Sequence, residues 1–276
     1  MRDFHSVSSA LRDIDVVFNA AALKQVPTCE YFPYEAVQTN IGGPENIVRA
    51  IRELNLPVET VIGISTDKAC KPVNVMGMTK AIQERVFIKA NIDCPATRFV
   101  CVRYGNVLAS RGSVIPLFHQ QIRAGGPVTL TTPDMTRFLL SLDDAVDTVF
   151  TALREARPGE TYIPRAPAAN ITDVAAVLIG DRPVETVFIG IRPGEKTYEI
   201  LISDEEAYRT SARGAYYAIR PMLPEIESDD SAPPALSREY SSADDVMSRA
   251  ALADLLRARR LLLDDAAPDT DEELLR

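Results

Sequence analysis

Three continuous apolar runs mark the first part of the chain, and each predicts a strand. They lie at 15–22, 60–65 and 99–103. Apolar runs without polar alternation are typical of strands in a parallel sheet, because both faces of such a sheet are covered. We therefore expect these strands to be buried side by side.

Helical periodicity separates the apolar runs. In the clearest case Ile47, Ala50, Ile51 and Leu54 share one face of a helix at 45–54. Further helices are expected at 6–12, 34–39 and 79–90. Because strands and helices alternate, the pattern predicts an α/β fold with a parallel sheet and right-handed crossovers.

The regular alternation ends near residue 106, and a mixed pattern follows. The segments expected there are helices at 113–123 and 142–153 and strands at 128–131, 161–163 and 187–191. The predicted division is a sheet domain at 1–107 and 138–165, a smaller α/β lobe at 108–137 and 166–225, and a linker with a C-terminal helical tail at 226–276. Ligands of open α/β sheets bind outside the carboxyl ends of the strands, so the lobe should hold the substrate.

Composition and charge narrow the class of protein. The chain has 276 residues, of which 46% are hydrophobic and 25% charged, as in ordinary globular proteins. The net charge of −9 argues against nucleic acid or an anionic membrane as the main partner. No apolar run is long enough to cross a membrane, and the N-terminal residues do not form a signal-peptide pattern.

The cysteine and histidine pattern argues against a metal site. The four cysteines show no C-x-x-C spacing, and the two histidines, His5 and His119, are far apart in sequence. We expect free thiols in a reducing compartment and place the protein in the cytoplasm.

The strongest chemical signal follows the strand at 60–65. Asp67 and Lys68 come directly after it, next to Thr66, and a helix carrying Met76 and Lys80 begins a few residues later. An acid and a base side by side at a strand end suit proton transfer to and from a bound substrate. The alternative interpretations are a solvated turn, a surface lysine at Lys80 and a core-filling methionine at Met76.

Six motifs in order give this chain a family resemblance. They are Asn19–Pro27, Ser65–Lys68, Met76-x-x-x-Lys80, Arg103–Val107, Met135–Phe138 and Arg192–Lys196. Over residues 2–202 the sequence resembles the extended short-chain dehydrogenase/reductases. Within them it is most similar to the nucleotide-sugar 4,6-dehydratases that act on UDP-N-acetylglucosamine, the polysaccharide-biosynthesis group.

The resemblance implies a Rossmann-type sheet, yet the glycine-rich turn that binds the dinucleotide in such a sheet is missing. The thirteen glycines include no G-x-G-x-x-G, the turn that lets backbone N–H groups approach a pyrophosphate. At roughly 30 residues per βαβ unit, about 60 residues would precede residue 1. We expect an incomplete Rossmann-type sheet and an upstream gene start, with Val16–Phe18 as an unprotected edge. The chain alone should then be poorly soluble and bind no dinucleotide.

The resemblance also implies roles for the residues around Asp67. The expected cofactor is NADP or NAD, with Asp67 as the acid that helps water leave and Lys68 as the base at sugar carbon 5. Lys68 must be neutral to act, and burial near the charge of Lys80 would favour the neutral amine. Thr66 would bond the 4-hydroxyl and Lys80 the nicotinamide ribose. Met76 replaces a tyrosine of the superfamily, so the first proton acceptor stays open between Lys80, Asp67 and water.

The remaining site residues are also carried over from the resemblance. Cofactor-binding residues would be Asn19, Ala20, Ala21, Asn40, Lys80 and Tyr104. Substrate-binding residues would be Lys24, Asn106, Arg111, Arg137, Arg192 and Glu195. The arginines suit a diphosphate because a guanidinium matches phosphate oxygens, although each could instead form a surface ion pair.

Three functions remain open at this point. The first is a UDP-N-acetylglucosamine 4,6-dehydratase, with or without inversion at carbon 5, in surface polysaccharide or glycan precursor biosynthesis. The second is a nucleotide-sugar 4-epimerase of the same fold, against which the adjacent Asp67 and Lys68 count. The third is a non-catalytic remnant, or a subunit completed by another polypeptide. A complete enzyme would be a homo-oligomer.

Overall fold

The chain divides into two compact units. We describe a computed structural model that covers residues 1–110, 113–192, 194–226 and 233–265. The first unit comprises Met1–Gly105, Leu142–Ala166 and Glu199–Ser241, and the second comprises Asn106–Ser141, Pro167–Tyr198 and the chain from Ser242 onward. These bounds differ from the predicted ones, because residues 199–225 join the first unit and the predicted tail supplies a helix to the second.

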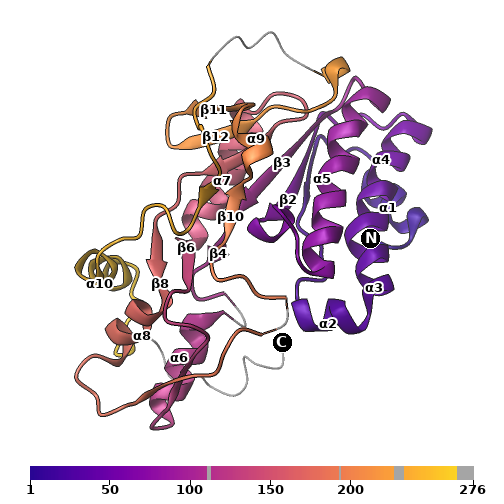
Figure 1. Cartoon of the computed structure of the whole chain (residues 1–276). Coiled ribbons are helices and arrows are strands. Elements are labelled where there is room, and N and C mark those ends of the chain that lie inside the picture. Colours follow the sequence, from indigo (N-terminus) through magenta and orange to yellow (C-terminus); the bar gives the residue numbers. More distant parts are fainter. Residues whose placement is uncertain (111–112, 193, 227–232, 266–276) are drawn as a thin grey trace. The chain divides into compact units, whose positions relative to one another are not determined.

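A six-stranded sheet forms the centre of the first unit (Figure 1). Its strands, in spatial order, are β1 (Val16–Asn19), β2 (Thr60–Thr66), β3 (Arg98–Tyr104), β7 (Thr161–Pro164), β12 (Tyr216–Ile219) and β11 (Thr210–Arg213). The first four run parallel, which confirms the predicted Rossmann-type sheet. The last two are antiparallel and were not predicted.

The antiparallel pair has a local cause. Only two residues, Gly214 and Ala215, separate β11 from β12, and Gly214 has a φ of 58°. A two-residue connection closes an antiparallel hairpin, and glycine adopts its left-handed backbone without steric cost. A parallel pair would have needed a long crossover.

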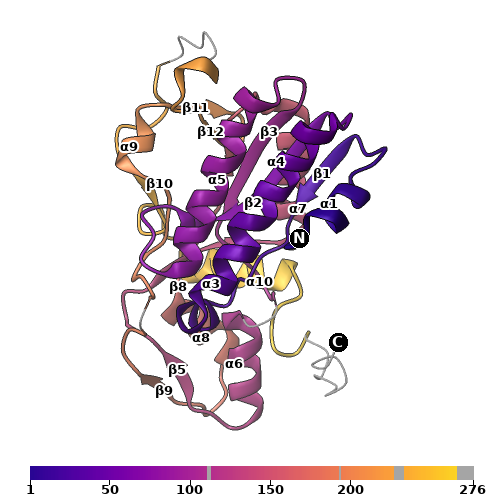
Figure 2. The ribbon, with the colours of Figure 1, turned by 90° about the vertical axis from the view of Figure 1, so that its right-hand side faces the viewer.

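Helices cover both faces of this sheet, as the apolar runs predicted. Alternate residues of β2 and β3 point to opposite sides. Val61, Phe99 and Cys101 join the core beneath α1 (Phe4–Ala10), α4 (Gly43–Leu54) and α5 (Val75–Asp93). Ile62, Val100 and Val102 join the core beneath α7 (Leu142–Glu155). Figure 2 shows α4 and α5 in front of the sheet and α7 behind it.

Shorter elements complete the first unit. They are α2 (Val26–Tyr31), α3 (Pro33–Val37), a π-helical turn (Gln38–Gly42), a 3-10 turn (Asp67–Ala69), β10 (Ile200–Ile202), α9 (Asp204–Ala207), a second 3-10 turn (Pro224–Ile226) and β13 (Tyr240–Ser241). Strands β10 and β13 pair antiparallel. All four cysteines lie in this unit as buried free thiols.

The second unit packs three helices around one apolar core. Its elements are β4 (Asn106–Val107), α6 (Val114–Arg123), β5 (Val128–Leu130), β6 (Thr136–Leu140), β8 (Ala168–Asn170), α8 (Ile171–Ile179), β9 (Thr186–Phe188) and α10 (Arg249–Ala258). Leu252 and Leu256 of α10 are fully buried in that core. Parts of the predicted linker and tail at 226–276 lie outside the described residues.

A buried arginine joins four elements of the first unit. Arg103 on β3 donates to Glu84 of α5 at 3.0 and 2.6 Å and to Glu206 of α9 at 2.8 and 3.0 Å. It also donates to the carbonyl of Leu201 in β10 at 2.8 Å. Ser65 of β2 donates to Glu84 at 2.5 Å. Each buried charge therefore has partners, as a buried ion pair requires.

The exposed edge of β1 predicts self-association of the chain. The side chain of Phe18 is 43% exposed and β1 is an outer strand of the sheet. An apolar edge strand is a template for pairing with another chain, and a lysine in it blocks such pairing. We expect Phe18→Lys to lower self-association several-fold in light scattering. Phe32→Lys, at an aromatic residue 59% exposed outside any strand, is the control and should have little effect.

The ion network predicts acid sensitivity. Burial alone would raise the pKa of Glu206, but the charge and hydrogen bonds of Arg103 lower that pKa to about 2 from an ordinary 4.5. A lowered pKa stabilises the fold above the unfolded-state value, and this contribution is lost as the pH falls from 4.5 toward about 2. Urea unfolding at a series of acidic pH values should show a loss of about 3 kcal/mol. Glu206→Gln should abolish that loss, whereas Glu225→Gln, at an exposed position, should retain it; equal acid sensitivity in both variants would contradict the assignment.

Candidate active site

The carboxyl end of β2 forms the centre of the site. The strand ends at Thr66, and the chain turns at once into the 3-10 turn Asp67–Ala69. The Thr66 hydroxyl accepts from the Lys68 N–H at 3.4 Å, which caps the turn. Cys70 then leads to Asn74, whose side chain caps α5 by accepting from the Gly77 N–H at 2.8 Å.

Asp67 is fully buried at this strand end. Its Oδ1 accepts from the Thr66 hydroxyl at 2.7 Å, the Lys68 N–H at 2.9 Å and Lys68 Nζ at 3.1 Å. Its Oδ2 has no hydrogen-bond partner among the described residues. The three hydrogen bonds all fall on Oδ1, so Oδ2 is the oxygen available to a substrate. The solvated-turn interpretation is therefore wrong for Asp67.

Lys68 lies between two carboxylates. Its Nζ is 3.1 Å from Asp67 Oδ1 and 3.6 Å from Glu199 Oε1. Glu199 immediately precedes β10 and is 4% exposed in its side chain. The sequence reasoning missed Glu199, although a glutamate directly before the buried run Ile200–Ile202 was a signal that could have found it.

The charges around Lys68 differ from those expected. We expected burial and the charge of Lys80 to dominate around Lys68, but its Nζ lies within 3.6 Å of two carboxylates, those of Asp67 and Glu199. Asp67 and Lys68 therefore form an ion pair at this strand end.

Lys80 is buried beneath the same strand end. Its Nζ donates to the carbonyl of Ile64 in β2 and to Gln83 Oε1, the latter at 2.6 Å. Burial lowers the pKa of Lys80 to about 8. Its alternative interpretation as a surface lysine is wrong, and near neutral pH its amine lies close to its titration point.

Met76 fills an apolar cluster. It is 5% exposed and packs with Cys29 and Ala36 and against Leu23 and Val26. Its position in the first turn of α5 agrees with the core-filling interpretation. A thioether there cannot accept the proton that a tyrosine would, so that step needs another group.

The predicted cofactor residues lie in different environments. Asn19, at the end of β1, is buried, and neither its amide nitrogen nor its amide oxygen has a partner among the described residues. Ala20 and Ala21 follow it and are exposed. Tyr104 ends β3, where it pairs in register with Thr66, and burial raises the pKa of its hydroxyl. Asn19, Thr66 and Tyr104 thus mark the carboxyl ends of three adjacent parallel strands.

Asn40 has a structural task within the same region. Its side chain accepts from the Leu23 N–H at 2.8 Å and donates to the Leu23 carbonyl and the Thr79 hydroxyl, each at 3.0 Å. It therefore fixes the loop after β1 by imitating a backbone partner. Lys24 follows Leu23 in that loop and is exposed.

Most predicted substrate residues belong to the second unit. Arg137 is buried there and donates to the carbonyls of Thr136 at 2.7 Å, Lys196 at 2.9 Å and Thr197 at 3.1 Å. The last two bonds hold the end of the Arg192–Lys196 motif and the residue that follows it. Within that motif, Arg192 is exposed and Glu195 is partly buried, while Asn106 is half-buried in β4. Arg111 lies outside the described residues.

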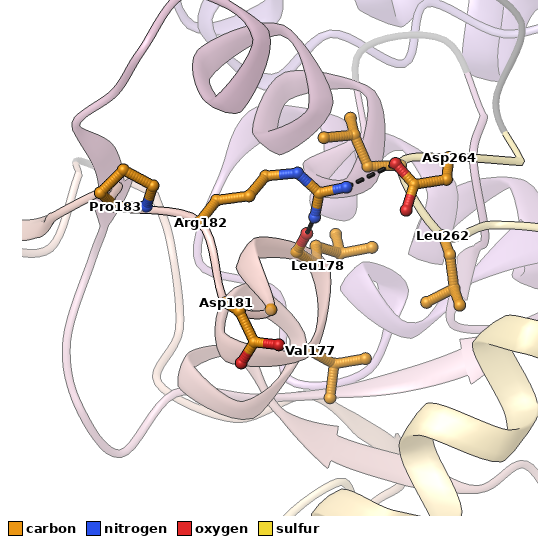
Figure 3. Close-up of a pocket in the computed structure, with 9 residues that line it drawn as sticks. Val177, Leu178, Asp181, Arg182, Pro183, Leu262 and Asp264 are labelled. Carbon is orange, nitrogen blue, oxygen red and sulfur yellow. Dashed lines mark hydrogen bonds and ion pairs between the residues drawn. The ribbon is translucent and has the colours of Figure 1, made fainter.

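A pocket in the second unit contains none of these residues (Figure 3). Its volume is about 580 Å³, and it lies between the end of α8 and residues 262–264. Arg182 points across it and donates to the Leu178 carbonyl and to Asp264. The guanidinium already has protein partners, and the residues that line the pocket all belong to the second unit.

The described residues also bear on metal binding and membrane crossing. Within the described residues, no group of three or more acidic, histidine or cysteine side chains could hold a metal ion. Among those residues there is also no helix with the length and apolar character that crossing a membrane requires.

The comparison with protein families identifies the relationship. Residues 1–221 match the family described as polysaccharide biosynthesis protein. This chain belongs to that family. A curated relative from Rickettsia typhi, named UDP-glucose 4-epimerase, is 47% identical over 223 residues, which are 79% of this chain. The chain spans 65% of the length of that relative.

Solved structures support the fold. The X-ray structure of Pen from Bacillus thuringiensis is 35% identical, with a TM-score of 0.86, and the match covers 95% of this chain and 80% of Pen. DesIV of Streptomyces venezuelae, a dTDP-glucose 4,6-dehydratase solved with NAD, shares the fold at 19% identity and a TM-score of 0.62, over 71% of this chain and 67% of DesIV. The fold is that of the extended short-chain dehydrogenase/reductases, as the motifs implied.

Close packing of α5 on the catalytic turn predicts one sensitive glycine. A Cβ on Gly77 would lie 2.2 Å from the carbonyl oxygen of Lys68, whereas a Cβ on Gly42 would find its nearest neighbour at 3.9 Å. We expect Gly77→Ala to lower the free energy of unfolding by about 1–3 kcal/mol, because the Asp67–Lys68 turn must move. Gly42→Ala, the control, should be neutral or stabilising. Equal urea midpoints for Gly77→Ala and the unsubstituted chain would show that the turn is not constrained in this way.

Proposed function

We propose that this chain carries the acid–base centre of a nicotinamide-dependent nucleotide-sugar 4,6-dehydratase acting on UDP-N-acetylglucosamine. The observation that carries the proposal is the contact of 3.1 Å between Asp67 Oδ1 and Lys68 Nζ at the carboxyl end of β2. Loss of water from a sugar needs one group that gives a proton and another that takes one, and this pair supplies both within reach of one substrate.

The first unit fits the nicotinamide end of the cofactor. Asn19 offers a buried amide without a partner among the described residues, and Lys80 offers a buried amine at the same strand ends. We propose that Asn19, Lys80 and Tyr104 hold NAD or NADP there, beside the loop of Ala20 and Ala21 that Asn40 fixes. When bound, the cofactor would accept hydride from sugar carbon 4 and return it to carbon 6.

The protein's own residues would carry the proton transfers. Before the reaction, the one proton that the pair shares would be on Lys68. For Asp67 to act as the acid and Lys68 as the base, this proton must move to Asp67. Transfer across the 3.1 Å contact gives a neutral amine and a protonated carboxyl. Lys68 then takes the proton at carbon 5, and Asp67 donates its proton to the departing 6-hydroxyl, so one water leaves. Thr66, which donates to Asp67, is the proposed contact of the 4-hydroxyl.

The first proton acceptor must be a group other than Met76. Lys80 is the proposed acceptor, directly or through the ribose hydroxyl it would bind, because burial brings its pKa to about 8. An amine with this pKa is partly neutral at neutral pH and can take a proton from the 4-hydroxyl.

The second unit would hold the UDP part of the substrate. Arg192 is exposed and Glu195 is partly buried on the segment that Arg137 fixes, so Arg192 is the proposed diphosphate contact and Glu195 the proposed ribose contact. Asn106 and Lys24 are proposed contacts of the sugar. Arg137 would support binding mainly by holding that segment.

A 4-epimerase is the second candidate, and the name of the curated relative favours it. An epimerase returns hydride to carbon 4 and releases no water, so it has no need for a base at carbon 5. The two reactions therefore differ in product mass.

The dehydratase proposal predicts loss of one water molecule from the sugar nucleotide. The assay uses the 276-residue chain and, separately, the product of the gene with any in-frame upstream coding sequence, each with NADP and UDP-N-acetylglucosamine or UDP-glucose. Mass spectrometry should show the dehydrated product for the protein that binds the dinucleotide, and Lys68→Ala in that protein should lower the rate of product formation by about 10²–10⁴-fold.

Lys71→Ala is the matched control. Lys71 follows the same turn but pairs with Asp204 at 2.9 Å and Glu239 at 2.6 Å on the surface, so its removal should leave the rate nearly unchanged. A product of unchanged mass and altered configuration at carbon 4 would establish the epimerase instead. Full activity of Lys68→Ala would remove Lys68 from the mechanism.

A further inference from the structure

Glu199 is a buried carboxylate that neither the motifs nor the comparisons assign. Its Oε1 lies 3.6 Å from Lys68 Nζ, which also lies 3.1 Å from Asp67 Oδ1. Glu199 and Lys68 are 131 positions apart in the sequence. No local pattern could have joined the two residues, so the fold itself brings this second carboxylate to the pair.

The surrounding structure holds Glu199 in place. It leads directly into β10, which pairs with β13 and whose Leu201 carbonyl accepts from buried Arg103 at 2.8 Å. The strand is fully buried. Glu199 is thus attached to a strand that is held by a paired strand and by buried Arg103, as suits a residue that positions another side chain.

The charged groups facing Lys68 come from several elements. Asp67 comes from its own turn and Glu199 from the segment before β10. Helix α5 packs on the turn and carries Lys80, which bonds Ile64 and Gln83. Further along the turn, Lys71 is paired with Asp204 and Glu239. Asp67, Lys68 and Glu199 together carry one negative charge when both carboxylates are ionised.

We propose that Glu199 is a positioning residue that holds the Lys68 amine against Asp67 and keeps one proton on that pair. This inference rests on the proposed function, which requires one proton shared by Asp67 and Lys68. Without the charge of Glu199, the pair would release its proton at lower pH, because an opposite charge nearby favours the protonated amine. The pair would then lack the proton that the departing hydroxyl needs.

The test measures the amine of Lys68 without cofactor or substrate. The folded chain is labelled with a trace of acetic anhydride at a series of pH values, and peptide mass spectrometry gives the pH midpoint at which each lysine becomes reactive. In Glu199→Gln, the midpoint of Lys68 should fall by about one pH unit or more. Glu199→Asp should restore part of the shift.

Glu239→Gln is the matched control, because Glu239 pairs with Lys71 at 2.6 Å. It should lower the midpoint of Lys71 and leave that of Lys68 unchanged. The unsubstituted chain unfolded in urea provides a further reference. There the labelling midpoint of Lys68 should lie at lower pH than in the folded chain. Circular dichroism confirms that each variant is folded.

A second readout applies to the active enzyme. Glu199→Gln should move the alkaline limb of the pH–rate profile to lower pH, by the same amount as the labelling midpoint, with the KM for the sugar nucleotide little changed. An unchanged Lys68 midpoint in folded Glu199→Gln overturns this inference whether or not the sugar is dehydrated. Absence of dehydration by the unsubstituted protein, with the midpoint shift present, overturns the proposed function alone.

Discussion

The ion network of Arg103 is the constraint on which the first unit depends. One guanidinium in β3 binds a glutamate on α5, a glutamate on α9 and a carbonyl of β10. Removal of one partner from such a buried network leaves an uncompensated charge and typically costs about 3–5 kcal/mol. The same bonds fix β10 and therefore Glu199, so the electrostatics at Lys68 are connected to the centre of the sheet. Glu206 adds a second constraint, since it also caps the start of α9 together with Ser203.

Local features of the site could be predicted from the sequence. The strand at 60–65 and the helix that carries Met76 and Lys80 follow from an apolar run and a helical pattern, each of which involves only neighbouring residues. The order of the six motifs along the chain also sufficed to identify the family. The parallel strands were predicted because a run buried on both faces has no polar alternation, whereas the hairpin of β11 and β12 carries polar and half-buried positions that gave no such signal.

Long-range features of the site could not be predicted in this way. Arg103 and Glu206 are 103 positions apart, and nothing near either residue signals the other. The predicted environment of Lys68 lacked Glu199 for the same reason, since Glu199 comes from a segment that was assigned to the lobe from the sequence. Asn40 shows a different limit: the resemblance implied cofactor binding, but the side chain uses its amide to fix Leu23. An asparagine at such a position can bind a ligand or support a loop, and the sequence alone does not show its contacts.

Helix α5 carries Lys80, Gln83 and Glu84 on the side that packs against the sheet, and all three are buried and bonded there. An apolar helix face can slide by one turn on a sheet and lose little contact. This face cannot, because a shift of one turn would leave an ammonium and a carboxylate without partners in the interior. The three buried polar side chains therefore fix the position of the helix along the sheet. Glu84 and Arg103 are direct partners, so a change of either one alone would leave a buried charge unpaired and would loosen the register of this helix on the sheet.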